Sequence, residues 1–87
     1  MSEQPRYLEK AKQTYKFHRE QVLSHNEWTI AATAKALRCS FGNVAEDLLI
    51  ARWSKTHENQ LMKFSYRYEA LKFIKEKQKE QNLDEIE

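Results

Sequence analysis

The chain has 87 residues, of which 32% are charged and 40% hydrophobic, with one glycine, one proline and one cysteine. This length fits one small domain, and the shortage of glycine and proline favours helices with short connections. The lone Cys39 excludes an internal disulfide, and no apolar run approaches the roughly 20 residues of a membrane-spanning helix. The composition therefore predicts an all-α protein. Because the first ten residues contain no apolar signal region, we also expect it to be cytoplasmic.

The first predicted helix covers residues 5–24. Pro5 suits its first turn, because the fixed φ of proline is helical and its missing N–H has no partner there. Residues at spacings near 3.6 then form one stripe, made of Tyr7, Leu8, Ala11, Tyr15, His18 and Val22. Asn26 is a plausible stop for this helix.

Residues 29–53 carry two short helical patterns on either side of a three-residue turn, 38–40. Thr29 and Ser40 are predicted to cap the two helices. Each helix has one apolar face, formed by Ile30, Ala34 and Leu37 in the first and by Val44, Leu48 and Ala51 in the second. Ala34 is small enough to let the two helices cross closely. The pattern predicts a helix-turn-helix, which commonly presents its second helix to the DNA major groove.

The remaining residues predict two more helices and a tail. Thr56 can cap a short fourth helix that carries Leu61, Met62 and Phe64. A fifth helix is predicted over 65–79, starting at Ser65, with Tyr66, Ala70, Phe73 and Ile74 near one face. Residues 80–87 contain four acids and no base, which predicts an acidic, disordered tail. We therefore expect one domain of about five helices over residues 1–79.

The segment around the turn is similar to a known family. The order Ala34, Leu37, Ser40, Val44, Leu48, Ala51, with Ser65 and Ala70 after a polar link, resembles the helix-turn-helix of the ParB and KorB type. Relatives of that module occur in small phage and plasmid proteins, including the DNA-binding regions of phage small terminase subunits. The resemblance covers about residues 26–75. It implies a sequence-biased binder of double-stranded DNA that acts as a regulator or as a recognition factor in packaging, partition or replication.

The resemblance also implies which residues contact DNA. The base-reading positions are Ser40, Phe41, Gly42, Asn43, Ala45 and Glu46. Glu46 and its neighbour Asp47 are acidic, and this helix has no base before Arg52, so phosphate contacts must come from elsewhere. The candidates are Lys10, Lys12, Lys16, Arg19, Lys35, Arg38, Lys63 and Arg67. Many relatives have glycine where this chain has Arg38, so we expect a left-handed backbone there.

Other function classes receive less support. Glu46 and Asp47 are adjacent on a helix and make a poor catalytic pair, and His18 and His25 alone are too few ligands for zinc. We therefore expect no enzyme activity, metal, cofactor or small-molecule substrate. A protein-interaction adaptor using the acidic third helix and an RNA-binding protein stay open as alternatives. We also expect a weak homo-oligomer through residues 65–79, because helix-turn-helix proteins commonly pair on two half-sites.

Overall fold

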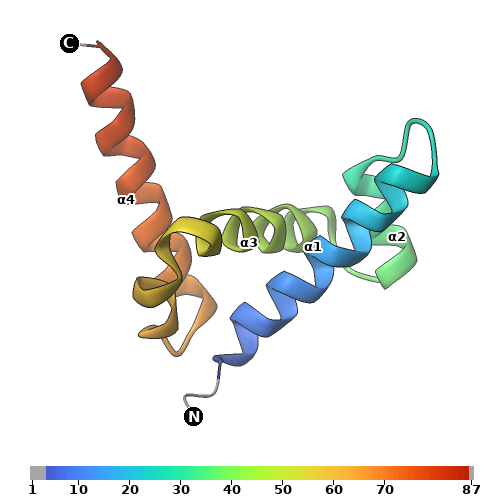
Figure 1. Ribbon diagram of the computed structural model, residues 1–87, viewed down its shortest axis with the longest axis horizontal. Helices are drawn as coiled ribbons and strands as arrows, with labels where there is room; N and C mark the ends of the chain where they lie inside the picture. Colours follow the sequence, from blue (N-terminus) through green and yellow to red (C-terminus); the bar gives the residue numbers. More distant parts are fainter. Residues whose placement is uncertain (1–3, 87) are drawn as a thin grey trace.

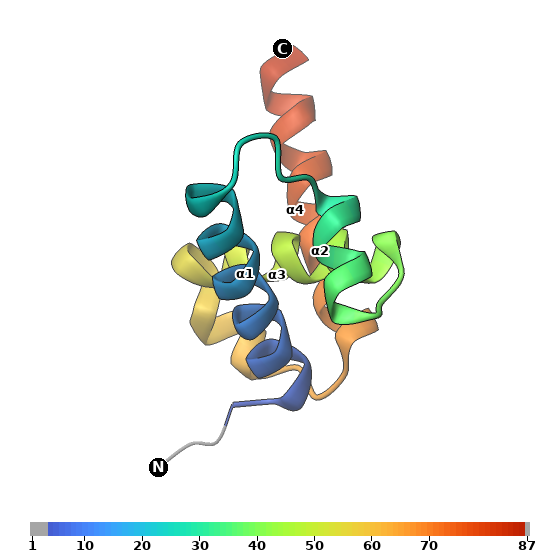
Figure 2. The same ribbon diagram turned by 90° about the vertical axis from the view of Figure 1, so that its right-hand side faces the viewer.

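The computed structural model describes residues 4–86, with side chains through Gln81. Over this range the chain forms four helices and no strand: α1 (Arg6–Ser24), α2 (Ile30–Leu37), α3 (Phe41–Met62) and α4 (Arg67–Ile86) (Figures 1 and 2). The all-α expectation is confirmed, whereas the expected number of about five helices is one too high. None of the four described helices combines the length and the apolar content that a membrane crossing requires.

The core lies where α1 crosses α3 and where the first half of α4 meets α3 (Figure 1). Its fully buried side chains include Leu8, Ile50, Leu61 and Ile74, one or two from each of these helices. The Tyr7 hydroxyl donates a hydrogen bond to the backbone carbonyl of Leu61 and so joins the start of α1 to the end of α3. Burial, followed by the charge of Glu69, raises the pKa of Tyr7 to about 12, so the phenol keeps the proton that it donates.

Helix α1 agrees with its predicted bounds, because it follows Pro5 and ends at Ser24. The predicted stripe is buried in its first half, where Leu8 and Ala11 have no exposed surface. Farther along the helix the prediction fails, since Val22 is 45% exposed. Thr14, which the apolar pattern omits, is buried because its hydroxyl has a partner in the core, the carboxylate of Asp47.

The predicted third and fourth helices form a single helix, α3, with a kink. His57 has φ −127° and ψ 31°, which breaks the helical geometry without ending the helix. Thr56 does not cap a new helix. Its hydroxyl contacts the Trp53 carbonyl and the His57 ring, at 3.4 and 2.7 Å. The prediction located the irregular point to within one residue but mistook a bend for a boundary.

Helix α4 begins at Arg67, two residues after the predicted start, and continues to Ile86. The Glu69 carboxylate accepts from the Tyr66 backbone N–H at 3.2 Å, which supports the first turn. The predicted disordered tail is therefore helical through Ile86, and Glu87 lies outside the described residues. Glutamate, glutamine and leucine make up most of this stretch and all three favour helix, so its net negative charge does not prevent helix formation. Ala70 and Ile74 are buried as predicted, but Tyr66 is 61% exposed.

Candidate nucleic-acid interface

The turn between α2 and α3 occupies three residues and has the predicted backbone. Arg38 lies in the left-handed region with φ 57° and ψ 41°. The Cys39 N–H donates to the Ala34 carbonyl at 2.9 Å, a bond that spans the end of α2, and the Arg38 N–H donates to the same carbonyl. The left-handed residue and this bond together reverse the chain sharply, so that α3 starts directly beside the end of α2.

Both predicted caps are present. The Thr29 hydroxyl accepts from the Ala32 N–H, and the Ser40 hydroxyl accepts from the Asn43 N–H, each at 3.1 Å. Each cap fixes the first turn of its helix by pairing a backbone donor that the helix itself leaves open. Ser40 is one of the predicted base-reading residues, and the structure uses its hydroxyl for this cap.

The first turn of α3 faces solvent. Phe41 is 57% exposed, and Ser40, Gly42 and Asn43 are exposed as well. A side-chain carbon added at Gly42 would meet no atom within 4 Å. Behind them the helix sinks into the protein, because Val44 is fully buried and Ala45 is half-buried. Four of the six predicted base-reading residues therefore form one accessible surface at the tip of α3.

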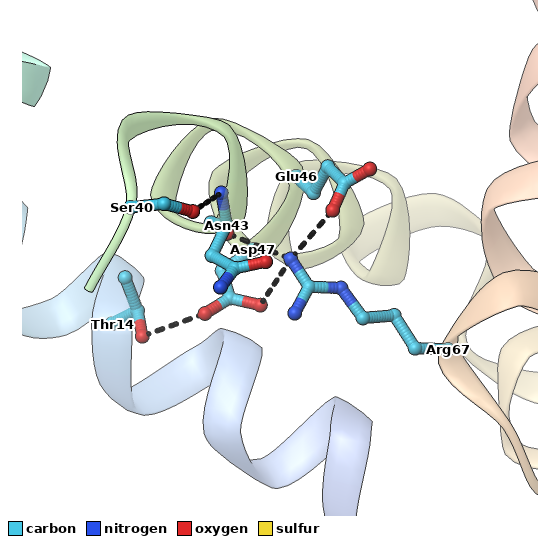
Figure 3. Close-up of polar contacts among 6 residues, drawn as sticks. All are labelled: Thr14, Ser40, Asn43, Glu46, Asp47 and Arg67. Atoms are coloured by element: carbon cyan, nitrogen blue, oxygen red, sulfur yellow. Dashed lines mark hydrogen bonds and ion pairs between the residues drawn. The ribbon is translucent and has the colours of Figure 1, made fainter. Parts of the chain in front are cut away.

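Two adjacent carboxylates of α3, those of Glu46 and Asp47, are held by Arg67 of α4 (Figure 3). Its Nη2 atom lies 2.8 Å from Oε1 of Glu46, 2.8 Å from the Asn43 carbonyl oxygen and 3.6 Å from Oδ1 of Asp47. Asp47 is only 2% exposed, and its other carboxylate oxygen accepts from the Thr14 hydroxyl at 3.1 Å. Asp47 is thus a core residue and not part of an acidic surface.

This arrangement changes the predicted role of Arg67. A guanidinium that pairs with two carboxylates and a carbonyl of the same chain is not available as an ordinary phosphate contact. Its Nε atom is buried and lacks a partner among the described residues. No local pattern in the sequence indicates this pairing, because 20 residues separate Arg67 from Asp47.

The remaining predicted phosphate contacts do not form one surface. Lys35 and Arg38 are exposed beside the turn, and Lys10 of α1 lines the same small recess as Leu37 and Cys39. Arg19 lies elsewhere, in a groove between α1 and α3. The other candidates are not at the turn either: Lys12 pairs with Glu58 at 2.5 Å, Lys16 is exposed on α1, and Lys63 follows the far end of α3. The structure thus brings three of the eight cations to the turn.

Thr33 of α2 forms a polar cluster with Trp28 and His18, which the apolar pattern missed. Thr33 is fully buried, and its hydroxyl accepts from the Trp28 indole N–H at 2.7 Å and lies 2.6 Å from Nδ1 of His18. Burial lowers the pKa of His18, which favours the neutral ring that accepts from the Thr33 hydroxyl. A threonine in a helix that is apolar apart from it and Lys35, with tryptophan five residues before it, was the available signal.

Comparison of the chain with protein-family models, with curated proteins and with solved structures found no significant match.

Proposed function

We propose that the chain binds double-stranded DNA through the tip of α3 and the turn before it, using α2, the turn and α3 as a helix-turn-helix. The observation that carries this proposal is the pairing of Arg67 with Glu46 and the burial of Asp47. Without them, two carboxylates on the reading helix would repel a polyanion. With them, Arg67 offsets one of the two negative charges, and the buried Asp47 is shielded from approaching phosphates.

The electrostatics of the turn support this proposal. The cations there, Lys10, Lys35 and Arg38, have no carboxylate within 4 Å among the described residues. They lie around the end of α2 and the start of α3, where the N-terminus of a helix also favours an anion. Phosphates on both sides of a groove could therefore be bound while α3 enters it.

The exposed first turn supplies the groups that would read bases. Asn43 can pair with adenine, and the Phe41 ring can contact a thymine methyl. Figure 3 shows that one carboxylate oxygen of Glu46 points away from Arg67. That oxygen can accept from a cytosine amino group while the other keeps its ion pair. The surface offers few phosphate contacts relative to its number of base contacts. We therefore expect binding that is selective for sequence rather than tight.

The same contacts disfavour an adaptor that uses the acidic third helix, since Asp47 is buried and the charge of Glu46 is offset by Arg67. The resemblance to the ParB and KorB helix-turn-helix supports a role as a regulator or site-recognition factor of a phage or mobile element. Nothing in the described residues favours RNA over DNA.

Selection of bound sequences from a random duplex pool, with the purified chain, tests this function. Recovery of a consensus, and affinity that falls steeply with salt, would support it. Asn43→Ala should then relax the preference at one base pair, and Lys35→Ala should weaken all duplexes about equally. Lys63→Ala is the matched control, because Lys63 lies beyond the 22 residues of α3, about 30 Å from the turn. Binding that is lost equally in all three variants would contradict the docking.

A further inference from the structure

A groove of about 610 Å³ lies between the second half of α1 and the first half of α3, with Ile30 of α2 also in its lining. Its apolar lining includes Val22, Leu23, Ile30, Leu48 and Leu49. Leu23 is 77% exposed and Val22 45% exposed, although both are large aliphatic side chains. Apolar residues clustered in a concave surface are typical of a site for a partner's helix.

The charge around the groove has one sign. Arg19 and Arg52 are exposed at its edge, and no carboxylate lines it. Neither arginine has an acidic partner within 4 Å among the described residues. The groove therefore fits a helix that combines apolar anchors with negative charge.

The chain itself contains such a helix. The last turns of α4 have the sequence EQNLDEI, with Leu83 and Ile86 three positions apart, a spacing that puts two residues on one face of a helix. Residues 80–87 carry four acids and no base, the opposite sign to the groove. Both views show the end of α4 leading away from α1 and α2, so a single chain does not bring the two together (Figures 1 and 2).

We propose that this groove binds the end of α4 from a second copy of the chain. Two copies would exchange their α4 ends around a twofold axis, and each groove would be filled once. This interface differs from the one expected over residues 65–79, because Ala70 and Ile74 of that stripe are buried within their own chain. The proposal does not depend on DNA binding.

Sedimentation equilibrium of the full chain tests the exchange. We expect a reversible dimer for the parent. Arg19→Glu/Arg52→Glu should weaken the dimer by about tenfold or more, since acidic helix ends then meet acidic grooves. Asp84→Lys/Glu85→Lys should have the same effect, since basic ends then meet basic grooves. Circular dichroism of each variant establishes that it is folded.

Mixing the two variants gives the sharpest result. In the mixed dimer both grooves meet an end of opposite charge, so dimerisation should return to near the parent level. Arg6→Glu/Lys10→Glu is the control, because it makes the same charge change on exposed residues of α1 outside the groove. A parent that is monomeric up to about 1 mM, a dimer that neither variant weakens, or a mixture that fails to recover would each overturn the proposal.

Discussion

Nη2 of Arg67 lies 3.6 Å from Oδ1 of Asp47, and the Asp47 side chain is almost completely shielded from water. The opposite oxygen of that carboxylate accepts from Thr14. One buried acid on α3 is therefore bound from α1 on one side and from α4 on the other. The contact has a structural role that is independent of any ligand.

Replacing Arg67 should destabilise the fold. Arg67→Met leaves Asp47 buried with one hydrogen bond, and we expect a loss of about 1–3 kcal/mol in the free energy of unfolding. The partial exposure of Arg67 keeps the loss below that of a fully buried pair. Urea denaturation measures it. Arg6→Met, at an exposed arginine outside the groove and without an ion pair among the described residues, should change stability by less than about 0.5 kcal/mol.

A double-mutant cycle separates the pair from its surroundings. Adding Asp47→Asn to Arg67→Met removes the uncompensated charge, so the double variant should be more stable than the sum of the two single losses predicts. Strict additivity would mean that the 3.6 Å contact carries no coupling.

Arg38→Gly should separate folding from DNA binding. Glycine adopts the left-handed conformation without the cost of a Cβ, and we expect a gain in stability of up to about 1 kcal/mol. Removal of one cation at the turn should weaken duplex binding and reduce its salt slope by about 0.9. Arg38→Ala loses the charge but keeps a Cβ. It should therefore bind duplex as weakly as Arg38→Gly does, without the gain in stability.

Ala34→Leu tests the crossing of α2 and α3. Ala34 is 5% exposed, so three additional carbons have no space and should cost about 1–3 kcal/mol. A thermal melt followed by circular dichroism measures the change. Ala36→Leu, at an exposed position of the same helix, is the control and should leave the melt nearly unchanged.

Acid should destabilise the protein through His18. Burial lowers the pKa of His18 in the fold from 6.5, so the unfolded chain takes up the proton first as the pH falls. The contribution of His18 is complete above pH 6.5 and is lost as the pH falls below that value. His18→Gln should flatten the dependence of unfolding midpoints on pH below 6.5, whereas His25→Gln should preserve it. An unchanged slope in the His18 variant would refute this assignment.

Features set by local sequence were predictable. Thr29 and Ser40 each have a hydroxyl that accepts from the backbone N–H three residues later. The turn between the helices has only three residues, which requires a strained backbone position such as Arg38. The tip of α3 was located correctly for the same reason. Its selectivity for DNA stays a prediction.

Features set by distant contacts were not predictable. Asp47 looked like a surface acid, because its partners Thr14 and Arg67 lie 33 and 20 residues away. The burial of Thr33 depends on groups of Trp28 and His18 that fill its hydrogen-bonding capacity. Periodicity ranks residues by hydropathy alone, so it cannot identify polar residues that are buried because they are paired.

The kink at His57 divides α3 into two segments with different attachments. The first carries Ile50 and Ala51 into the core, and the second is attached through Leu61, which meets Tyr7. A break in helical geometry interrupts the cooperativity that makes neighbouring helical turns open together. The helical turns after His57 can therefore fray from the α4 side, and their amide protons then exchange with solvent. The amide protons of the first segment stay protected until α1 itself detaches.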